Sequence, residues 1–164
     1  MNRQARRAAR AWFAVIPLAV ACATATPTPA VAPRIVPPVL EFRLEWLGAA
    51  DLDMYVGGPH GKKVWYGEPR SPSGGVLNVD CNVNPGDACT EPVETVKWPP
   101  GRAPPGIYQY WVRLMHPREA ELPVVFQVTV LRDAQVLAQH HGEIDIPGDS
   151  SQKWLIVYPR NLGF

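Results

Sequence analysis

The sequence predicts an all-β protein, an antiparallel β-sandwich of about eight strands that follows a signal peptide and a Pro-rich tether. Short segments alternate apolar and polar residues with a period of two, which is typical of strands that bury one face. Turn-forming residues separate these segments, and the 164 residues include 19 Pro and 13 Gly. No window keeps the period of a helix, so the pattern favours two stacked antiparallel sheets.

Eight or nine short segments carry this strand pattern. The expected strands cover residues 40–46, 51–56, 64–66, 76–80, 93–98, 107–115, 124–131, 136–141 and 154–158. Tyr108 follows Gly106 at the start of a strand, which resembles a tyrosine corner; a plain core tyrosine is the alternative. His140 and His141 are neighbours on one strand and face opposite sides, which indicates a polar edge strand rather than a shared metal site.

Residues 1–21 have the pattern of a secretory signal peptide, with four Arg before a short apolar run and small residues after it. The run of about 11 residues is too short for a transmembrane helix. The segment from Leu18 to Cys22 resembles a bacterial lipobox, although Leu18 stands one place further from the cysteine than usual. We therefore expect lipidation of Cys22 and a membrane partner, with ordinary signal-peptidase cleavage as the alternative.

The expected location is the bacterial cell envelope, as an outer-membrane lipoprotein that faces the periplasm or the surface; a soluble secreted or periplasmic protein is the alternative. Residues 22–38 would hold the lipid and form an extended Pro-rich linker of up to about 50 Å, and residues 39–164 would form the sandwich. Without residues 1–21 the chain has 12 Lys and Arg against 15 Asp and Glu, so we expect no nucleic-acid partner.

Cys81 and Cys89 are predicted to form a disulfide, because exported proteins fold in an oxidising compartment. A bond across so short a loop stabilises a fold by about 2.5 kcal/mol on the chain-entropy model. A metal-thiolate pair is the alternative, but no further Cys or His lies near in the sequence.

Oxygen-bearing side chains around these cysteines predict a cation site. Asp80, Asn82 and Glu91 stand at the first, third and twelfth places of a segment, where a calcium loop puts ligands, but the segment lacks that loop's glycine and flanking helices. Asp51 and Asp53 share one face of a strand, and bound Ca²⁺ would relieve their repulsion. The alternative is that both acids are solvated or are paired with Lys or Arg neighbours; Lys62 and Lys63 lie across the presumed hairpin.

The order of several short motifs resembles the YfaP-like family of exported bacterial proteins. The fragments are Trp46, residues 50–56 (ADLDMYV), residues 59–61 (PHG), residues 74–80 (GGVLNVD), residues 94–98 (ETVKW) and residues 106–108 (GIY). The first fragments are also similar to bacterial pre-peptidase C-terminal domains, some relatives of which bind calcium. The resemblance implies an extracytoplasmic, calcium-stabilised β-sandwich, with Asp51, Asp53, Asp80, Asn82 and Glu94 as the matching positions. Thr95 replaces the family's usual Asn.

A non-catalytic binding module is the expected function. The sequence has no G-x-S-x-G or H-E-x-x-H motif and no cysteine-protease context, so an enzyme is not expected and a hydrolase is the remotest alternative. Trp111 and Arg113 lie on one strand face and could contact a glycan or protein partner if that face is exposed; a buried face is the alternative. A structural or accessory envelope subunit that pairs through a sheet edge is the second interpretation.

Overall fold

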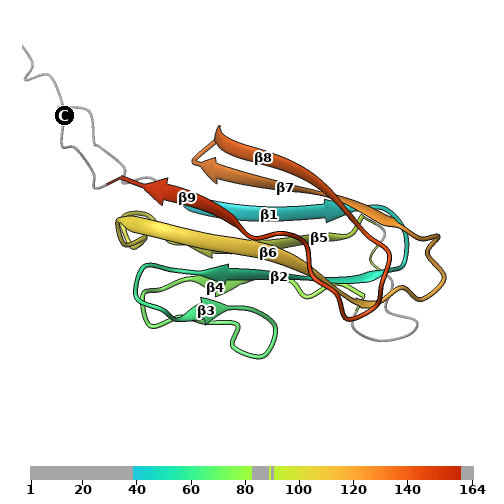
Figure 1. Cartoon of the computed structure of the whole chain (residues 1–164). Coiled ribbons are helices and arrows are strands. Elements are labelled where there is room, and N and C mark those ends of the chain that lie inside the picture. Colours follow the sequence, from blue (N-terminus) through green and yellow to red (C-terminus); the bar gives the residue numbers. More distant parts are fainter. Residues whose placement is uncertain (1–38, 83–88, 90, 160–164) are drawn as a thin grey trace, which may run out of the picture. The chain divides into compact units, whose positions relative to one another are not determined.

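The computed structural model describes residues 39–82, 89 and 91–159, which form two antiparallel sheets packed face to face (Figure 1). The described strands are β1 (Leu40–Trp46), β2 (Asp51–Gly57), β3 (Lys63–Val64), β4 (Val76–Leu77), β5 (Val93–Trp98), β6 (Gly106–His116), β7 (Val124–Arg132), β8 (Gln135–Ile144) and β9 (Trp154–Tyr158). One sheet has the order β4-β5-β1-β7-β8 and the other has the order β3-β2-β6-β9. The predicted antiparallel β-sandwich is confirmed.

The described residues contain no helix, and therefore none with the length and hydropathy of a membrane span. The predicted signal peptide, Cys22 and the Pro-rich linker fall in residues 1–38, outside the described residues. Residues 83–88 of the cysteine-flanked segment also lie outside them.

Strand β1 is the centre of the five-stranded sheet, and its alternating apolar and polar residues explain why one face of this sheet is buried and the other faces outward. Its partners are β5 and β7, which come much later in the chain; Leu40 pairs with Trp98, and Trp46 with Phe126. The apolar residues of β1 are buried in the core between the sheets. Its alternate residues face outward, where Glu41 forms ion pairs with Arg43 (2.8 Å) and Lys97 (3.1 Å).

Aromatic rings fill the middle of the core. The ring of Phe42 lies 5.1–6.1 Å, centroid to centroid, from those of Trp98, Tyr108 and Tyr110, distances at which aromatic pairs attract. The hydroxyl of Tyr108 donates a hydrogen bond of 2.8 Å to the carbonyl oxygen of Pro104. The expected tyrosine corner is thus confirmed, and it fixes the start of β6 against the preceding loop.

Strands β3 and β4 are shorter than predicted. Trp65 and Glu68 exchange two backbone hydrogen bonds in a tight turn, so β3 ends at Val64. Strand β3 pairs only with Val56 and Gly57, and it leaves the first half of β2 without a strand on that side. Asp80, which precedes Cys81, brings a carboxylate oxygen close to Asp51 and Asp53 in this half of β2.

Strand β8 forms one edge of the five-stranded sheet, as the polar pattern around His140 and His141 predicted. The two histidines have different surroundings. The ring of His140 stacks on Trp154 with centroids 4.8 Å apart and forms a 2.9 Å hydrogen bond with the Tyr110 hydroxyl. His141 is exposed. The neighbours therefore share no ligand site.

Candidate metal centre

Asp51 and Asp53 enter the site from β2, on the face opposite the core residues Leu52 and Met54. Both aspartates are nevertheless buried, with exposed fractions of 5% and 4%. In the register of the four-stranded sheet Asp53 lies opposite Arg113 of β6. Alternation along β2 therefore places two carboxylates on one face, and the surrounding segments cover them.

Asp80 brings a third carboxylate to the same place from the segment before the disulfide. One oxygen each of Asp51, Asp53 and Asp80 lies within 4.8 Å of the others, and Asp80 is exposed to solvent. The Oδ2 atom of Asp53 is buried and has no hydrogen-bond partner among the described residues. Carboxylate oxygens are the ligands that hard cations prefer, so this cluster could hold a metal ion.

The electrostatics of the cluster favour a positive partner. Burial, and then the charges of Asp51 and Asp80, raise the pKa of Asp53 from 3.8 to about 7 despite the opposing effect of Arg113. Burial also raises the pKa of Asp51, and Arg118 opposes that rise. Since each raised pKa reflects a cost of keeping the carboxylate ionised, a bound cation would stabilise the ionised form.

Glu94 connects the two segments that supply the carboxylates. It projects from β5 with an exposed fraction of 1%. Its Oε2 atom accepts a hydrogen bond from the Met54 N–H (2.8 Å), and its Oε1 atom accepts one from the Cys81 N–H (3.4 Å). The Met54 N–H lies in the half of β2 that β3 leaves unpaired, so Glu94 takes the place of a neighbouring strand.

Glu94 also lies within hydrogen-bonding reach of Asp80. Two carboxyl groups can share a hydrogen bond only if one of them carries the proton. Burial, the largest of several causes, raises the pKa of Glu94 well above its ordinary value. Because both of its oxygens accept backbone N–H groups, we assign Glu94 a role in positioning the two segments; it lies beside the three-carboxylate cluster and is not one of its members.

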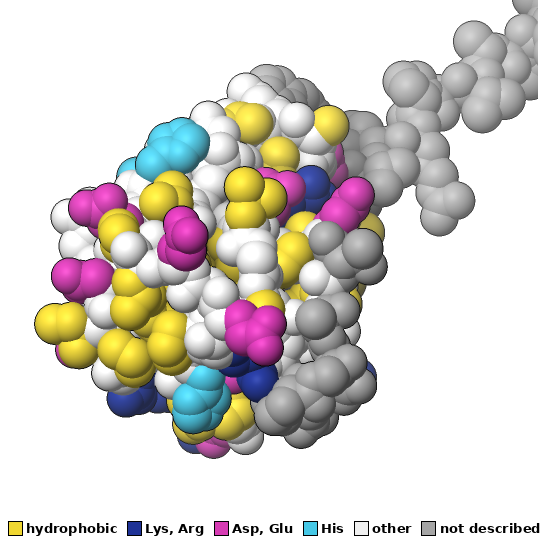
Figure 2. All heavy atoms as spheres, turned by 90° about the vertical axis from the view of Figure 1, so that its right-hand side faces the viewer, with side chains coloured by type: hydrophobic (Ala, Val, Ile, Leu, Met, Phe, Trp, Pro, Cys, Tyr) yellow, Lys and Arg dark blue, Asp and Glu magenta, His cyan; other side chains and the backbone are white. Residues whose placement is uncertain are grey.

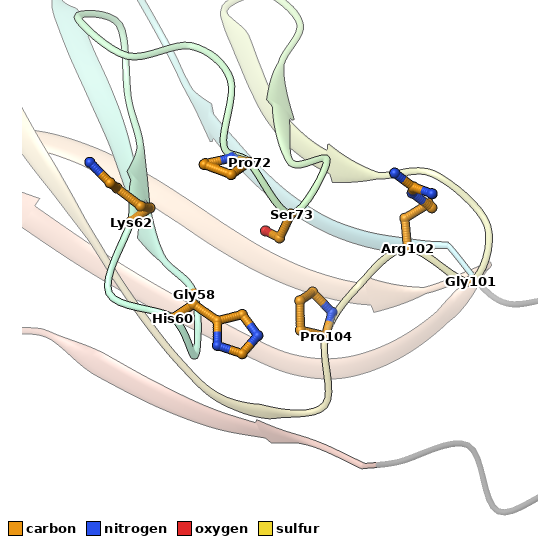
Figure 3. Close-up of a pocket in the computed structure, with 8 residues that line it drawn as sticks. All are labelled: Gly58, His60, Lys62, Pro72, Ser73, Gly101, Arg102 and Pro104. Atoms are coloured by element: carbon orange, nitrogen blue, oxygen red, sulfur yellow. The ribbon is translucent and has the colours of Figure 1, made fainter.

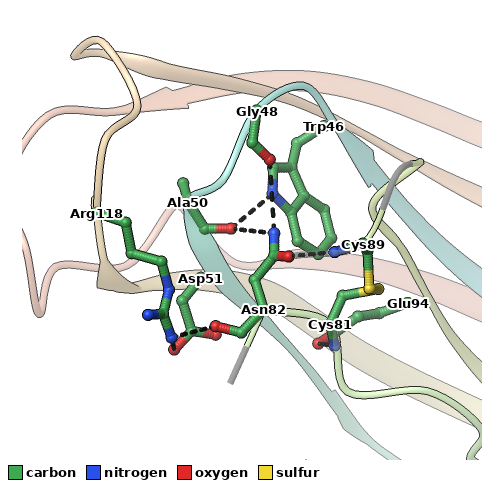
Figure 4. A network of polar contacts seen from close by, with 9 residues as sticks. All are labelled: Trp46, Gly48, Ala50, Asp51, Cys81, Asn82, Cys89, Glu94 and Arg118. Carbon is green, nitrogen blue, oxygen red and sulfur yellow. Dashed lines mark hydrogen bonds and ion pairs between the residues drawn. A yellow bond between two sulfur atoms is a disulfide. The ribbon is translucent and has the colours of Figure 1, made fainter. Parts of the chain in front are cut away.

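A polar network beside the cluster holds the disulfide against β2 (Figure 4). The side-chain amide of Asn82 donates to the Ala50 carbonyl (2.9 Å), and its oxygen accepts from the Cys89 N–H (2.7 Å). The indole N–H of Trp46 donates to the same Ala50 carbonyl (2.8 Å). Asn82 has a φ of 64°, a left-handed conformation that Asn adopts more readily than most residues.

Arg118 links this network to the cluster. Its Nη2 atom lies 3.8 Å from Oδ2 of Asp51 and also donates to the backbone carbonyl of Asn82. Figure 4 shows the guanidinium beside Asp51, with the disulfide on the other side of Asn82. The network therefore supplies a protein cation to the carboxylates and also orients the chain next to Cys81.

The structure brings some of the predicted site residues together and separates others. Asp51, Asp53 and Asp80 meet, with Glu94 beside them, and the predicted bond between Cys81 and Cys89 is present. Asn82 lies next to the cluster, but its side-chain oxygen accepts the Cys89 N–H. Glu91 is exposed and is not part of the three-carboxylate cluster.

Of the Lys or Arg neighbours expected for the aspartates, the structure places arginines near them, and not Lys62 or Lys63. Because β3 is short, Lys63 lies over the rings of Tyr55 and Trp65, at 5.3 and 4.5 Å from their centroids. Arg113 and Arg118 take the expected role. Arg113 reaches Asp53 through the pairing of β2 with β6. Because these strands are far apart in the sequence, Arg113 could have been chosen only if that pairing had been predicted.

Trp111 and Arg113, the predicted ligand contacts, lie on the outer face of the four-stranded sheet and are half-buried. The Trp111 ring stacks on that of Tyr55 with a centroid distance of 5.1 Å, and the Lys153 ammonium lies 4.7 Å from its centroid. The Nε atom of Arg113 donates to the Gly148 carbonyl (3.0 Å). The outer face at Trp111 and Arg113 is therefore neither fully exposed nor fully buried, the two alternatives that the sequence left open.

A hollow of about 470 Å³ lies near the end of β2, away from the carboxylate cluster, and is lined by Gly58, His60, Lys62, Pro72, Ser73, Gly101, Arg102 and Pro104 (Figure 3). The side chains of Lys62 and Arg102 lie on opposite sides of the hollow in this view. They do not converge on one ligand atom, so we assign this hollow no site.

Comparisons with protein-family models, curated proteins and solved structures found no match to this chain. The functional conclusions below therefore depend on the geometry and chemistry of the described residues.

Proposed function

We propose that this chain is a non-catalytic binding domain of the bacterial cell envelope, and that Ca²⁺ bound by Asp51, Asp53 and Asp80 stabilises it. The observation that carries the metal proposal is the buried, unpartnered Oδ2 atom of Asp53, which belongs to a carboxylate within 4.8 Å of two others. An unsatisfied buried oxygen costs free energy, and a cation would satisfy it.

The donor set supports calcium, because Ca²⁺ takes six to eight oxygen ligands in flexible geometry, whereas Mg²⁺ demands a near-octahedral set and retains several waters. Ca²⁺ binds oxygen at about 2.3–2.6 Å, so two of its ligands can be up to about 5 Å apart. The three carboxylates, within 4.8 Å of one another, can thus surround Ca²⁺ without a large rearrangement. The ion would join β2 to the segment that the disulfide closes.

Thermal unfolding of the purified protein tests the metal proposal. With CaCl₂ in 100-fold excess over the Kd, we expect a Tm about 10 °C higher than in EGTA, because ligand bound only to the folded state stabilises it. Asp53→Asn should remove this increase, and Asp145→Asn, which changes an exposed aspartate outside the cluster, should retain it. Equal melting temperatures in CaCl₂ and EGTA, or equal responses to CaCl₂ and MgCl₂, would contradict the proposal.

The envelope location rests on the signal pattern and Cys22. Lipidation there would make the membrane a partner and leave the sandwich on a Pro-rich linker. Metabolic labelling with radioactive palmitate tests this proposal in a host that exports the chain. Label should enter the wild-type protein and be lost from Cys22→Ala; equal labelling of both proteins, or of neither, would contradict it.

Trp111 supports a binding role for the outer face of the four-stranded sheet. Its half-buried ring and the nearby Lys153 ammonium are groups that can contact a glycan or a protein partner. Glycan-array binding that Trp111→Ala abolishes and Arg113→Ala weakens would support this role. Unchanged binding in Trp111→Ala would remove the tryptophan from the site.

An accessory subunit that pairs through a sheet edge is the second candidate. Strand β9 is an edge of the four-stranded sheet, and Leu155 and Val157 expose 63% and 69% of their surfaces. An uncharged edge strand lacks the usual protection against pairing with another chain. Light scattering over a range of protein concentrations should show association that Leu155→Lys reduces; a monomer at all concentrations would contradict self-pairing.

A further inference from the structure

A second acidic region lies at the end of the molecule where β1 turns into β2. Here a groove of about 720 Å³ is bounded by the outer face of the five-stranded sheet, by the β1–β2 turn and by the β6–β7 connection, residues 117–123. Figure 2 shows this end of the molecule, where hydrophobic side chains gather among acidic ones. We call this surface the acidic groove and define it by Glu45, Leu47, Glu119, Glu121, Val125 and Phe126.

The apolar part of the acidic groove is unusually open to solvent. Leu47 exposes 87% of its surface and Val125 exposes 60%, while Phe126 below them is buried. Single exposed apolar residues are common, but two that line one concave surface favour a binding site. A ligand that covers Leu47 and Val125 would gain free energy from removing them from water.

The charges of the acidic groove have one sign. Glu45, Glu119 and Glu121 line it together with one histidine, His141, and none of its lining residues is Lys or Arg. In the described part of the chain these three glutamates form no ion pair, whereas Glu41 on the same outer face of β1 has two. The walls therefore present negative charge that the described residues do not neutralise, and a cationic ligand would complement it.

We propose that the acidic groove binds an extended peptide segment of a partner protein, in which Lys or Arg side chains alternate with an apolar side chain. Glu45 comes from β1 and Glu119 and Glu121 from the β6–β7 connection, with Leu47 and Val125 also lining the groove. A compact cation would leave the apolar residues uncovered. Long basic side chains lay their aliphatic stems on apolar surface and extend their charge to carboxylates. This inference does not depend on the calcium proposal.

Fluorescence anisotropy with a labelled Lys-Leu-Lys-Leu-Lys peptide tests this proposal on the purified protein at low ionic strength. We expect binding that the double variant Glu119→Gln/Glu121→Gln weakens about tenfold and that Leu47→Ser weakens about fivefold. All three side chains are exposed, so the variants should fold. Glu68→Gln, which removes an exposed carboxylate outside the groove, should bind like the wild type.

The matched peptide Glu-Leu-Glu-Leu-Glu should not bind, and added salt should weaken binding of the basic peptide. Measurements in CaCl₂ and in EGTA separate this proposal from the metal proposal, because the groove should bind in both. No binding by the wild type, equal affinity in the groove variants, or spermidine binding as tightly as the basic peptide would overturn the proposal.

Discussion

The molecule carries two acidic regions at the same end, and they differ in how their carboxylates are arranged. In the cluster, Asp51 and Asp53 are buried, converge with Asp80 and lie near arginines. In the acidic groove, Glu119 and Glu121 are exposed and stand apart around apolar residues. Convergence and burial suit a single ion, whereas separation around an apolar surface suits an extended ligand. Residue type alone would not distinguish them.

The largest effect on stability is expected from Glu94→Leu. This substitution removes a buried side chain that supports the carboxylate cluster, and it leaves the residues of the acidic groove unchanged. The substitution leaves the N–H groups of Met54 and Cys81 without their acceptor, and two buried unsatisfied donors cost about 3 kcal/mol. Urea unfolding measures the loss. Glu94→Gln keeps one acceptor oxygen and should lose less, while a loss below about 1 kcal/mol in Glu94→Leu would contradict the assigned role.

Removal of the disulfide should have the next largest effect. The bond joins residues eight apart, and Cys81→Ser combined with Cys89→Ser should reduce the free energy of unfolding by about 2.5 kcal/mol. Because Asp80 directly precedes Cys81, the thermal response to CaCl₂ should also decrease. The basic peptide should bind the double variant as it binds the wild type; a parallel loss of both activities would show that the two regions are not independent.

The pH dependence of stability should distinguish the buried carboxylates from the exposed ones. The folded protein raises the pKa of Asp53 from 3.8 to about 7, mainly through burial, so the folded state keeps a proton that the unfolded state releases. In EGTA, stability and Tm should therefore fall between about pH 4 and 7 and level off above. Calcium requires the ionised form, so its stabilising effect should grow over the same interval.

Scanning calorimetry at a series of pH values measures both trends. Asp53→Asn should flatten the fall in EGTA, and Asp145→Asn, at an exposed position, should leave it unchanged. Stability in EGTA that rises between about pH 4 and 7 would contradict the assigned direction.

The smallest effect is expected in the groove. Glu119 and Glu121 are exposed and form no ion pair with described residues, so Glu119→Gln/Glu121→Gln should change the free energy of unfolding by less than about 0.5 kcal/mol. Urea unfolding checks this value. A larger loss would mean that these side chains stabilise the fold and are not reserved for a ligand.

Much of the fold could be predicted from local pattern. Alternation identified β1 and β6, turn residues separated β7 from β8, and the Gly106–Tyr108 pattern identified the tyrosine corner, because each signal lies within a few residues. The lengths of β3 and β4 could not be predicted in the same way. The length of β3 depends on the turn between Trp65 and Glu68, and the strand-forming pattern there gave no sign of it.

The candidate site was predictable in part for a similar reason. Asp51, Asp53 and Asp80 could be chosen by residue type and by their nearness to strand ends or to the disulfide. Arg113 and Arg118 could not, since their positions follow from the pairing of β2 with β6 and from the path of the β6–β7 connection. The position of Glu94 under β2 depends on the packing of one sheet on the other.

The connection between β6 and β7 contributes to both acidic regions, and this affects which insertions and deletions would leave each region unaltered. Arg118 in this connection neutralises Asp51, and Glu119 and Glu121 beside it line the groove. Neighbouring side chains of one short segment thus serve both regions. A residue inserted or deleted there would shift the register of the whole segment, so we expect a change of its length to alter ion affinity and peptide affinity together.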